Sequence, residues 1–191
     1  MENTDGSWRR VSRETVYDNP WIRVYHDEVI NPNGGEGIYG VVHFKNVAVG
    51  VVPIDENGYT WLVGQERYPF EAYSWEIPEG GGPLGIDPLE SAKRELREEV
   101  GIEAQDWSTI IETHLSNSAT DEGSVLYCAR GITEAERSPD PTELLHVRHL
   151  PVNDAIAMVD RGEIRDSLSV TALLWLDRAR CRGEVRSEEH T

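Results

Sequence analysis

Three glutamates, Glu95, Glu98 and Glu99, fall within the short stretch SAKRELREEVGI, residues 91–102. At helical spacing they project to one side of a helix, next to its apolar stripe rather than opposite it. Like charges at this spacing destabilise a helix, but together they offer the hard oxygen ligands that Mg²⁺ or Mn²⁺ prefers. The cluster therefore predicts a metal site. The alternative is a solvated acidic face balanced by neighbouring lysine and arginine side chains.

The flanking residues predict how this cluster is positioned. Asp87 is suited to cap the helix, Pro88 to occupy its first position and Glu90 to complete a capping box. Gly101 fits the stop, so we expect a helix from Pro88 to Val100. The preceding EGGGPLG, residues 79–85, is expected to be a loop that brings its backbone close to a ligand. A divalent cation held there could bridge a pyrophosphate and neutralise charge developing on it.

The rest of the chain supplies hairpin strands before this helix, and strands and helices after it. Apolar runs and turn residues predict strands within residues 21–46, around a Pro-Asn-Gly-Gly turn, and at 47–55, 59–69, 108–115, 123–130 and 144–151. Residues 133–143 are expected to be a loop, and helices are expected near 152–160 and 166–180. The order predicts an α+β fold, an α/β/α sandwich with an N-terminal antiparallel strand extension.

The helix and its loop resemble the Nudix box, a glycine, five residues, a glutamate, seven residues and then Arg-Glu-apolar-x-Glu-Glu-x-Gly-apolar. Gly80 opens the box, and residues 94–102 match its second half throughout. Ile86 stands where the box has its first glutamate, which in the family is generally a supporting residue. This departure puts accessory metal binding in doubt more than the fold.

The resemblance extends over about residues 15–180. LVGQERYPFEAYSWEIPEG and GEIRDSLSVTALLWL are similar to the ADP-ribose and nucleoside-diphosphate-sugar pyrophosphatase branch. That branch implies Mg²⁺-dependent hydrolysis of a nucleoside diphosphate linked to another moiety, and a homodimer formed through N-terminal strands. It also implies that Glu95 and Glu99 are metal ligands, that Glu98 is a ligand or the partner of a metal-bound water, and that the backbone carbonyl of Glu79 is a further ligand.

Four residues outside the helix are candidates for catalysis or substrate binding. In related enzymes a loop after the box carries a glutamate that acts as general base or as an extra metal ligand. Glu122 in LSNSATDEGS is our candidate, with Asp121 in reserve. The alternative is a polar hairpin loop, since the family's Ser-Pro-Gly is absent. Arg67 could donate to a pyrophosphate, or it could form a surface salt bridge. Glu76 could accept hydrogen bonds from a base or ribose, or it could point to solvent.

Composition limits the partners. The 191 residues carry 35 acidic and 18 basic side chains, a formal charge of −17, which argues against binding long nucleic acids or anionic membranes. No apolar run is long enough for a membrane span, and MENTDGSWRR has no apolar signal-peptide core, so a cytoplasmic location is expected. We expect an N-terminal extension at 1–45, a Nudix hydrolase domain at 46–182 and a flexible acidic tail at 183–191.

The sequence thus predicts a Mg²⁺- or Mn²⁺-dependent pyrophosphohydrolase acting on ADP-ribose or another nucleoside diphosphate sugar. A second hypothesis within the same fold is hydrolysis of dinucleoside polyphosphates or of RNA 5′ ends. A third, from a different class, is a non-catalytic module that senses a nucleotide and regulates a partner. The intact second half of the box favours an enzyme.

Overall fold

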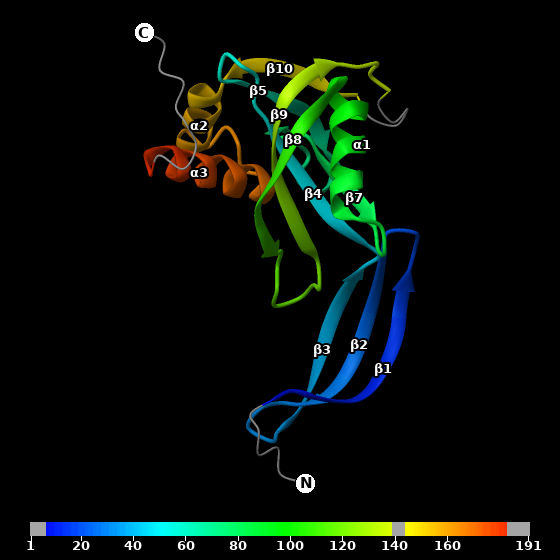
Figure 1. Cartoon of the computed structure of the whole chain (residues 1–191). Coiled ribbons are helices and arrows are strands. Elements are labelled where there is room, and N and C mark those ends of the chain that lie inside the picture. Colours follow the sequence, from blue (N-terminus) through cyan, green and yellow to red (C-terminus); the bar gives the residue numbers. More distant parts are fainter. Residues whose placement is uncertain (1–6, 139–143, 183–191) are drawn as a thin grey trace. The chain divides into compact units, whose positions relative to one another are not determined.

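A computed structural model describes residues 7–138 and 144–182, which form two compact units (Figure 1). One unit contains the described residues up to Val47 together with His114–Gly123, and the other contains Ala48–Thr113 and the described residues from Ser124 onward. The expected boundary after residue 45 lies close to Val47. His114–Gly123 also belongs to the first unit, although a division of the chain at a single point would place this segment in the second unit. The expected tail lies outside the described residues.

The N-terminal unit is built on a three-stranded antiparallel sheet of β1 (Arg9–Asp18), β2 (Ile22–Ile30) and β3 (Glu36–Phe44), in that order. β2 and β3 are the two strands expected around the Pro-Asn-Gly-Gly turn, where Gly34 adopts a φ of +86°. β1 was not predicted, because all ten of its residues are exposed and its sequence has no regular apolar alternation. β1 forms a strand because it pairs with β2, since hydrogen bonds to a neighbouring strand can stabilise a polar strand.

The segment His114–Gly123 belongs to the same unit because it is bonded to the end of β3. The backbone N–H of Val42 donates to the carbonyl of Ala119 at 2.9 Å, and the N–H of Asp121 donates to the carbonyl of Val42 at 3.2 Å. The Asp121 carboxylate lies 2.6 Å from Nδ1 of His43 and accepts the backbone N–H of Phe44 at 2.9 Å. The loop is therefore held by both backbone and side-chain contacts.

In its described residues, the second unit contains two sheets and three α-helices. The four-stranded sheet has the order β7 (Glu79–Pro83), β4 (Asn46–Pro53), β9 (Gly123–Glu134) and β8 (Ile102–His114), with β4 and β9 parallel. The three-stranded sheet has the order β10 (His146–Pro151), β5 (Tyr59–Arg67) and β6 (Ala72–Glu76), and the 3-10 helix η1 (Tyr68–Phe70) connects β5 to β6. The helices are α1 (Pro88–Val100), α2 (Val152–Asp160) and α3 (Ser167–Cys181).

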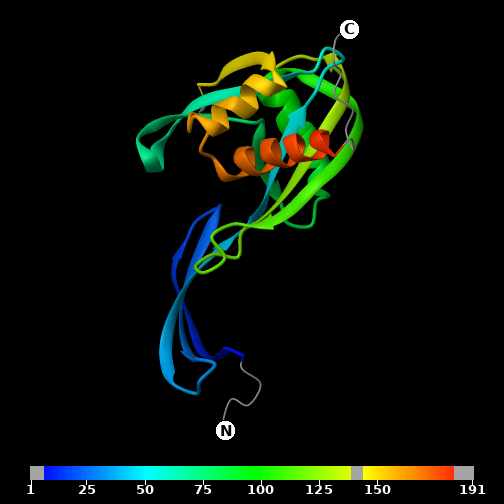
Figure 2. The same cartoon turned by 90° about the vertical axis from the view of Figure 1, so that its left-hand side faces the viewer.

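Helices cover the sheets of this unit from two sides. Figures 1 and 2 show α1 on one side and α2 with α3 on the other. Fully buried side chains from the strands, such as Val51 and Leu62, and from the helices, such as Leu96 and Leu173, form the core between them. The predicted α+β class and α/β/α sandwich are confirmed. None of the helices in the described ranges is long and apolar enough to cross a membrane.

Several predicted boundaries were wrong. The expected loop 79–85 begins with β7, which its three glycines conceal because they show no apolar alternation. β8 begins at Ile102 rather than near 108, and β9 continues to Glu134, inside the expected loop 133–143. β9 continues past its buried residues because strand pairing extends beyond the buried positions. β8 begins at the buried Ile102, directly after Gly101 ends α1. Residues 139–143 of that expected loop lie outside the described part of the chain.

Candidate active site

Helix α1 presents the three clustered glutamates as predicted. Oδ1 of Asp87 accepts the Leu89 N–H at 3.0 Å at its start, and Gly101 ends it with a φ of +79°. The expected capping box is not completed, because the Glu90 carboxylate pairs with Lys93 at 2.7 Å instead.

The glutamates differ in exposure. Glu99 is 4% exposed, and the side chains of Glu95 and Glu98 are 12% and 35% exposed. Burial of a carboxylate is costly unless the charge is paired or coordinates a metal. A solvated acidic face therefore does not describe Glu95 or Glu99.

Gly80 at the start of β7 lets the Glu95 carboxylate lie against the strand backbone. A Cβ atom at Gly80 would fall 2.2 Å from the Glu95 carboxyl carbon and would displace the Glu95 carboxylate from this position. Glycine is thus required here for close approach, as the box pattern suggested. The Glu95 carboxylate is held at the start of β7, where the expected carbonyl ligand, that of Glu79, is also located.

Arg94 fixes the orientation of two of the glutamates. Its guanidinium donates to Oε2 of Glu98 at 2.7 Å, to Oε1 of Glu95 at 2.6 Å and to the backbone carbonyl of Gly81 at 3.0 Å. Arg94 thus pairs with Glu98 one turn along the helix. Because one guanidinium contacts two carboxylates and β7, it holds the helix and the strand in a single arrangement.

The backbone of β7 also contacts the third glutamate. The N–H of Glu79 donates to Oε2 of Glu99 at 3.0 Å. Hydrogen bonds of this kind orient ligating carboxylates and increase their affinity for a metal. The oxygen-rich residues around Gly80 fit a hard divalent cation such as Mg²⁺ or Mn²⁺. The carbonyl of Glu79 stays a predicted ligand.

Arg67 and Glu76 lie together and bind one another. The Arg67 guanidinium donates to Oε1 and Oε2 of Glu76 at 2.9 and 2.5 Å, and to Oε1 of Glu79 at 3.1 Å. Glu76 is 2% exposed, so the alternative that it points to solvent is wrong. Arg67 forms a salt bridge, as its alternative interpretation states, but its partners Glu76 and Glu79 are largely buried rather than at the surface. Their predicted contacts with substrate remain predictions.

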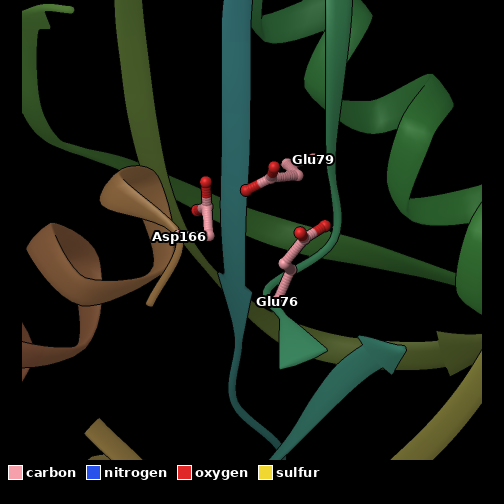
Figure 3. Close-up of side chains that lie close together, drawn as sticks. All are labelled: Glu76, Glu79 and Asp166. Atoms are coloured by element: carbon pink, nitrogen blue, oxygen red, sulfur yellow. The ribbon is translucent and has the colours of Figure 1, made fainter. Parts of the chain in front are cut away.

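A second group of carboxylates surrounds Glu79. One carboxylate oxygen from each of Glu76, Glu79 and Asp166 lies within 4.8 Å of the others, and Figure 3 shows the Glu79 and Asp166 carboxylates pointing toward one another. Burial and the charges of Asp166 and Glu76 raise the pKa of Glu79 well above its ordinary value. Oε2 of Glu79 is buried and accepts no hydrogen bond from any donor in the described ranges. Such a group favours uptake of either a proton or a cation.

Asp166 is the member of this group that sequence analysis missed. The sequence places it only at the start of the helix expected near 166–180, and its carboxylate does cap α3 by accepting the Ser169 N–H at 2.8 Å. Its distance along the chain from Glu76 and Glu79 means that no motif spacing could reveal the cluster. The only sequence signal was an aspartate at a helix start within the GEIRDSLSV segment.

Comparisons with known proteins decide the family. The family model described as the NUDIX domain matches residues 44–172, and that described as the nucleoside diphosphate sugar hydrolase N-terminal domain matches residues 8–42. The chain belongs to the Nudix family. Together these matches confirm the predicted nucleoside-diphosphate-sugar branch and identify a Nudix hydrolase.

Similar proteins support the same branch. An ADP-ribose pyrophosphatase of Mycobacterium tuberculosis is 33% identical over 168 residues, covering 86% of this chain and 80% of its own. An ADP-ribose pyrophosphatase of Bacillus subtilis is 28% identical, covering 88% and 91%. A crystal structure of an ADP compounds hydrolase superposes with a TM-score of 0.84 over 95% of this chain and 97% of its own, at 21% identity, which establishes the shared fold.

Ile86, at the position of the first glutamate of the Nudix box, lies in an exposed turn. It is 53% exposed, and its backbone N–H donates to the Pro83 carbonyl at 3.1 Å. Its side chain therefore does not belong to the core. The departure from the box pattern is a change on the surface of the turn before α1.

The predicted general base, Glu122, lies in the N-terminal unit, and the Nudix helix lies in the other unit. Within its own unit, burial and the charge of Asp121 raise the pKa of Glu122, which suits a group that must hold a proton briefly. Burial tends to raise the pKa of Asp121, but its hydrogen bonds with His43 and Phe44 lower it overall. Asp121 thus has a structural function, and the assignment of Glu122 stays a prediction.

Proposed function

We propose that this Nudix hydrolase cleaves the pyrophosphate bond of ADP-ribose or a related nucleoside diphosphate sugar, with Mg²⁺ or Mn²⁺ as cofactor. The products are a nucleoside monophosphate and a sugar phosphate. The observation that carries the proposal is the meeting of Glu95 and Glu99 with the start of β7, where Gly80 leaves room for one carboxylate and the Glu79 N–H orients the other. The names of the two pyrophosphatases similar to this chain support the substrate class.

The residues divide the chemical work between them. Glu95, Glu98 and Glu99, with the carbonyl of Glu79, would hold the cation, which when bound neutralises charge on the pyrophosphate and lowers the pKa of water. Arg94 keeps Glu95 and Glu98 in place. Glu98 is the most exposed of the three helix glutamates and is suited to orient the attacking water. Glu122 would accept a proton from that water while the water oxygen bonds to phosphorus and the bridging P–O bond breaks.

Arg67 has a double function in this proposal. It neutralises Glu76 and Glu79 within the protein, and more than a third of its side chain is exposed. The exposed part could donate to a substrate phosphate while the ion pair holds the guanidinium in place. Glu76, buried beneath it, would act through Arg67.

A substrate screen tests the proposal. The purified protein is incubated with Mg²⁺ and ADP-ribose, ADP-glucose, GDP-mannose, diadenosine polyphosphates or 5′-triphosphorylated RNA, and nucleoside monophosphate release is measured by chromatography, with pyrophosphate release measured for the RNA. We expect ADP-ribose or another nucleotide sugar to give the highest kcat/KM, and EDTA to abolish turnover. Preferred cleavage of dinucleotides or RNA would replace the proposed substrate. Nucleotide binding without turnover of any of them would support the sensing module.

We also propose that the N-terminal sheet forms a homodimer. Apolar residues on its strands are largely exposed: Val11 and Val16 of β1 are each 55% exposed, and Ile38 of β3 is 71% exposed. Exposed apolar side chains on both outer strands of the sheet favour a surface that another protein covers. Light scattering should give twice the chain mass of 21.5 kDa, and Ile38→Asp should shift the equilibrium toward monomer. A wild-type protein that is monomeric at micromolar concentration would exclude the dimer.

The expected cytoplasmic location stays a prediction.

A further inference from the structure

The first turn of α3 is bonded to the turn that leads into the Nudix box. The Ser169 hydroxyl is completely buried and accepts the backbone N–H of Ile77 at 2.9 Å. The same hydroxyl donates to Oδ2 of Asp166 at 2.9 Å. Because Asp166 directs the hydroxyl hydrogen toward itself, a lone pair of Ser169 is left facing Ile77.

Three different elements hold three consecutive residues of this turn. Ser169 of α3 binds Ile77, the N–H of Val51 in β4 donates to the carbonyl of Pro78 at 2.9 Å, and the N–H of Glu79 donates to Glu99 of α1 at 3.0 Å. The contact to Glu99 is the last of the series. Its geometry therefore depends on how the preceding two residues are fixed.

We propose that Ser169, oriented by Asp166, is a positioning residue for the metal site of this Nudix hydrolase. It fixes the peptide at Ile77, so that two residues later the Glu79 N–H meets the Glu99 carboxylate and the Glu79 carbonyl keeps its direction. The proposal rests on the proposed function, since it takes Glu99 as a metal ligand. Partners that orient a ligating group commonly change metal affinity by about 10- to 100-fold when they are removed.

The simpler explanation is that Ser169 only satisfies a buried N–H group. In that case its removal would lower stability, as removal of any buried hydrogen-bond partner does, but it would leave cation affinity unchanged. Metal binding and stability therefore separate the two explanations. Thr60 offers a matched control, because it is equally buried and its hydroxyl has no hydrogen-bond partner among the described residues.

The experiment measures Mn²⁺ binding to the full chain by electron paramagnetic resonance, without substrate. Ser169→Ala should raise the Kd for Mn²⁺ by about tenfold, while Thr60→Val should leave it within about twofold of wild type. Ser169→Thr retains the hydroxyl and should restore most of the affinity. In turnover assays the Mg²⁺ concentration for half-maximal rate should rise in parallel for Ser169→Ala, and kcat at saturating Mg²⁺ should change little.

A second pair of variants applies if Ser169→Ala does not fold. Asp166→Asn loses the charge but can still cap α3 and accept from the Ser169 hydroxyl, whereas Asp166→Ala loses these contacts as well, so Asp166→Ala should weaken Mn²⁺ binding more than Asp166→Asn does. Wild-type Kd values for folded Ser169→Ala, or for Asp166→Ala, would overturn the inference. If Glu99→Gln loses Mn²⁺ at the same time, only the positioning function fails. If Glu99→Gln also binds Mn²⁺ normally, the metal assignment in the proposed function fails with it.

Discussion

The backbone N–H of Glu79 donates to Oε2 of Glu99 across 3.0 Å, so β7 and α1 meet at a carboxylate. This contact orients the Glu99 carboxylate, so it fixes the direction of the other oxygen, Oε1, and it also fixes the direction of the Glu79 carbonyl. It also means that Glu99 has a structural function besides its proposed function as a ligand. Experiments on this residue have to separate the two.

Glu99→Gln separates them, because an amide oxygen can still accept the Glu79 N–H while the negative charge is lost. We expect turnover to fall by at least about 10²-fold, equivalent to about 2.7 kcal/mol of barrier, with little change in the melting temperature. Turnover and Mn²⁺ affinity are measured together. Near wild-type values for both would contradict the metal assignment. Glu90→Gln, on the same helix but exposed, serves as the control.

Ile86→Glu tests the position where the chain departs from the Nudix box. Since Ile86 is exposed, the substitution should not disturb packing. We expect kcat/KM to stay within about tenfold of wild type or to increase, because a supporting carboxylate is restored near the metal site. Leu84→Glu places the same charge on a residue of similar exposure in this turn and should bring no gain. A folded Ile86→Glu protein without activity would show that the position is more than accessory.

Glu122→Gln tests the predicted general base. A positioned base contributes about 10² to 10⁴ in rate, so kcat should fall by that factor with little change in KM. Because the pKa of Glu122 is raised, the acidic limb of the kcat profile of the wild type should lie above pH 4.5 and vanish in the variant.

Asp121→Asn is the matched variant in the same loop. Its carboxylate already pairs with His43, so its effect on kcat should be much smaller, and a loss of stability is the main expectation. Equal, small effects of both substitutions on kcat would mean that the loop has only a structural function and that Glu122 is not the general base. The attacking water would then be deprotonated by another group, with Glu98 the next candidate.

Glu79→Gln gives a pH-dependent effect on stability. The pKa of Glu79 is raised in the folded state, so the folded protein retains a proton that the unfolded chain releases above its ordinary pKa of 4.5. The free energy of unfolding of the wild type therefore falls as pH rises from 4.5 through the raised pKa. The stability of Glu79→Gln relative to wild type should increase as the pH rises above about 4.5.

Urea denaturation in EDTA measures this difference at each pH. Glu66→Gln, at an exposed position of β5, is the control and should show no such trend. A stability difference for Glu79→Gln that is constant over the whole pH range would contradict the raised pKa.

What could be predicted from the sequence was what is encoded locally. Asp87 and Gly101 delimit α1, and the spacing of its apolar residues places Glu95 and Glu99 next to the core, so both the helix and its cluster could be found. β7 could not, because its glycines serve the approach of Glu95 rather than a strand pattern. β1 could not either, since its residues are exposed and only pairing with β2 makes it a strand.

The surroundings of the site depend on contacts between distant parts of the chain. The sequence makes Glu76 a candidate for substrate binding, but it does not reveal Arg67 as its partner, because the pairing depends on the antiparallel register of β5 and β6. Asp166 approaches Glu79 only because α3 begins beside the turn after β6. Residue types indicated the chemistry, and tertiary structure decided which charges neutralise one another.

The grouping of His114–Gly123 with the N-terminal strands has a consequence for protein engineering. The two family matches meet near residue 43, which suggests that the catalytic portion could be expressed alone or fused to a different N-terminal sheet. Either change would remove His43 and the backbone of Val42 from Asp121, and with them the contacts that hold the loop of the predicted base. A transplant between relatives would have to exchange both segments at once, as a discontinuous module that no single cut in the gene can provide.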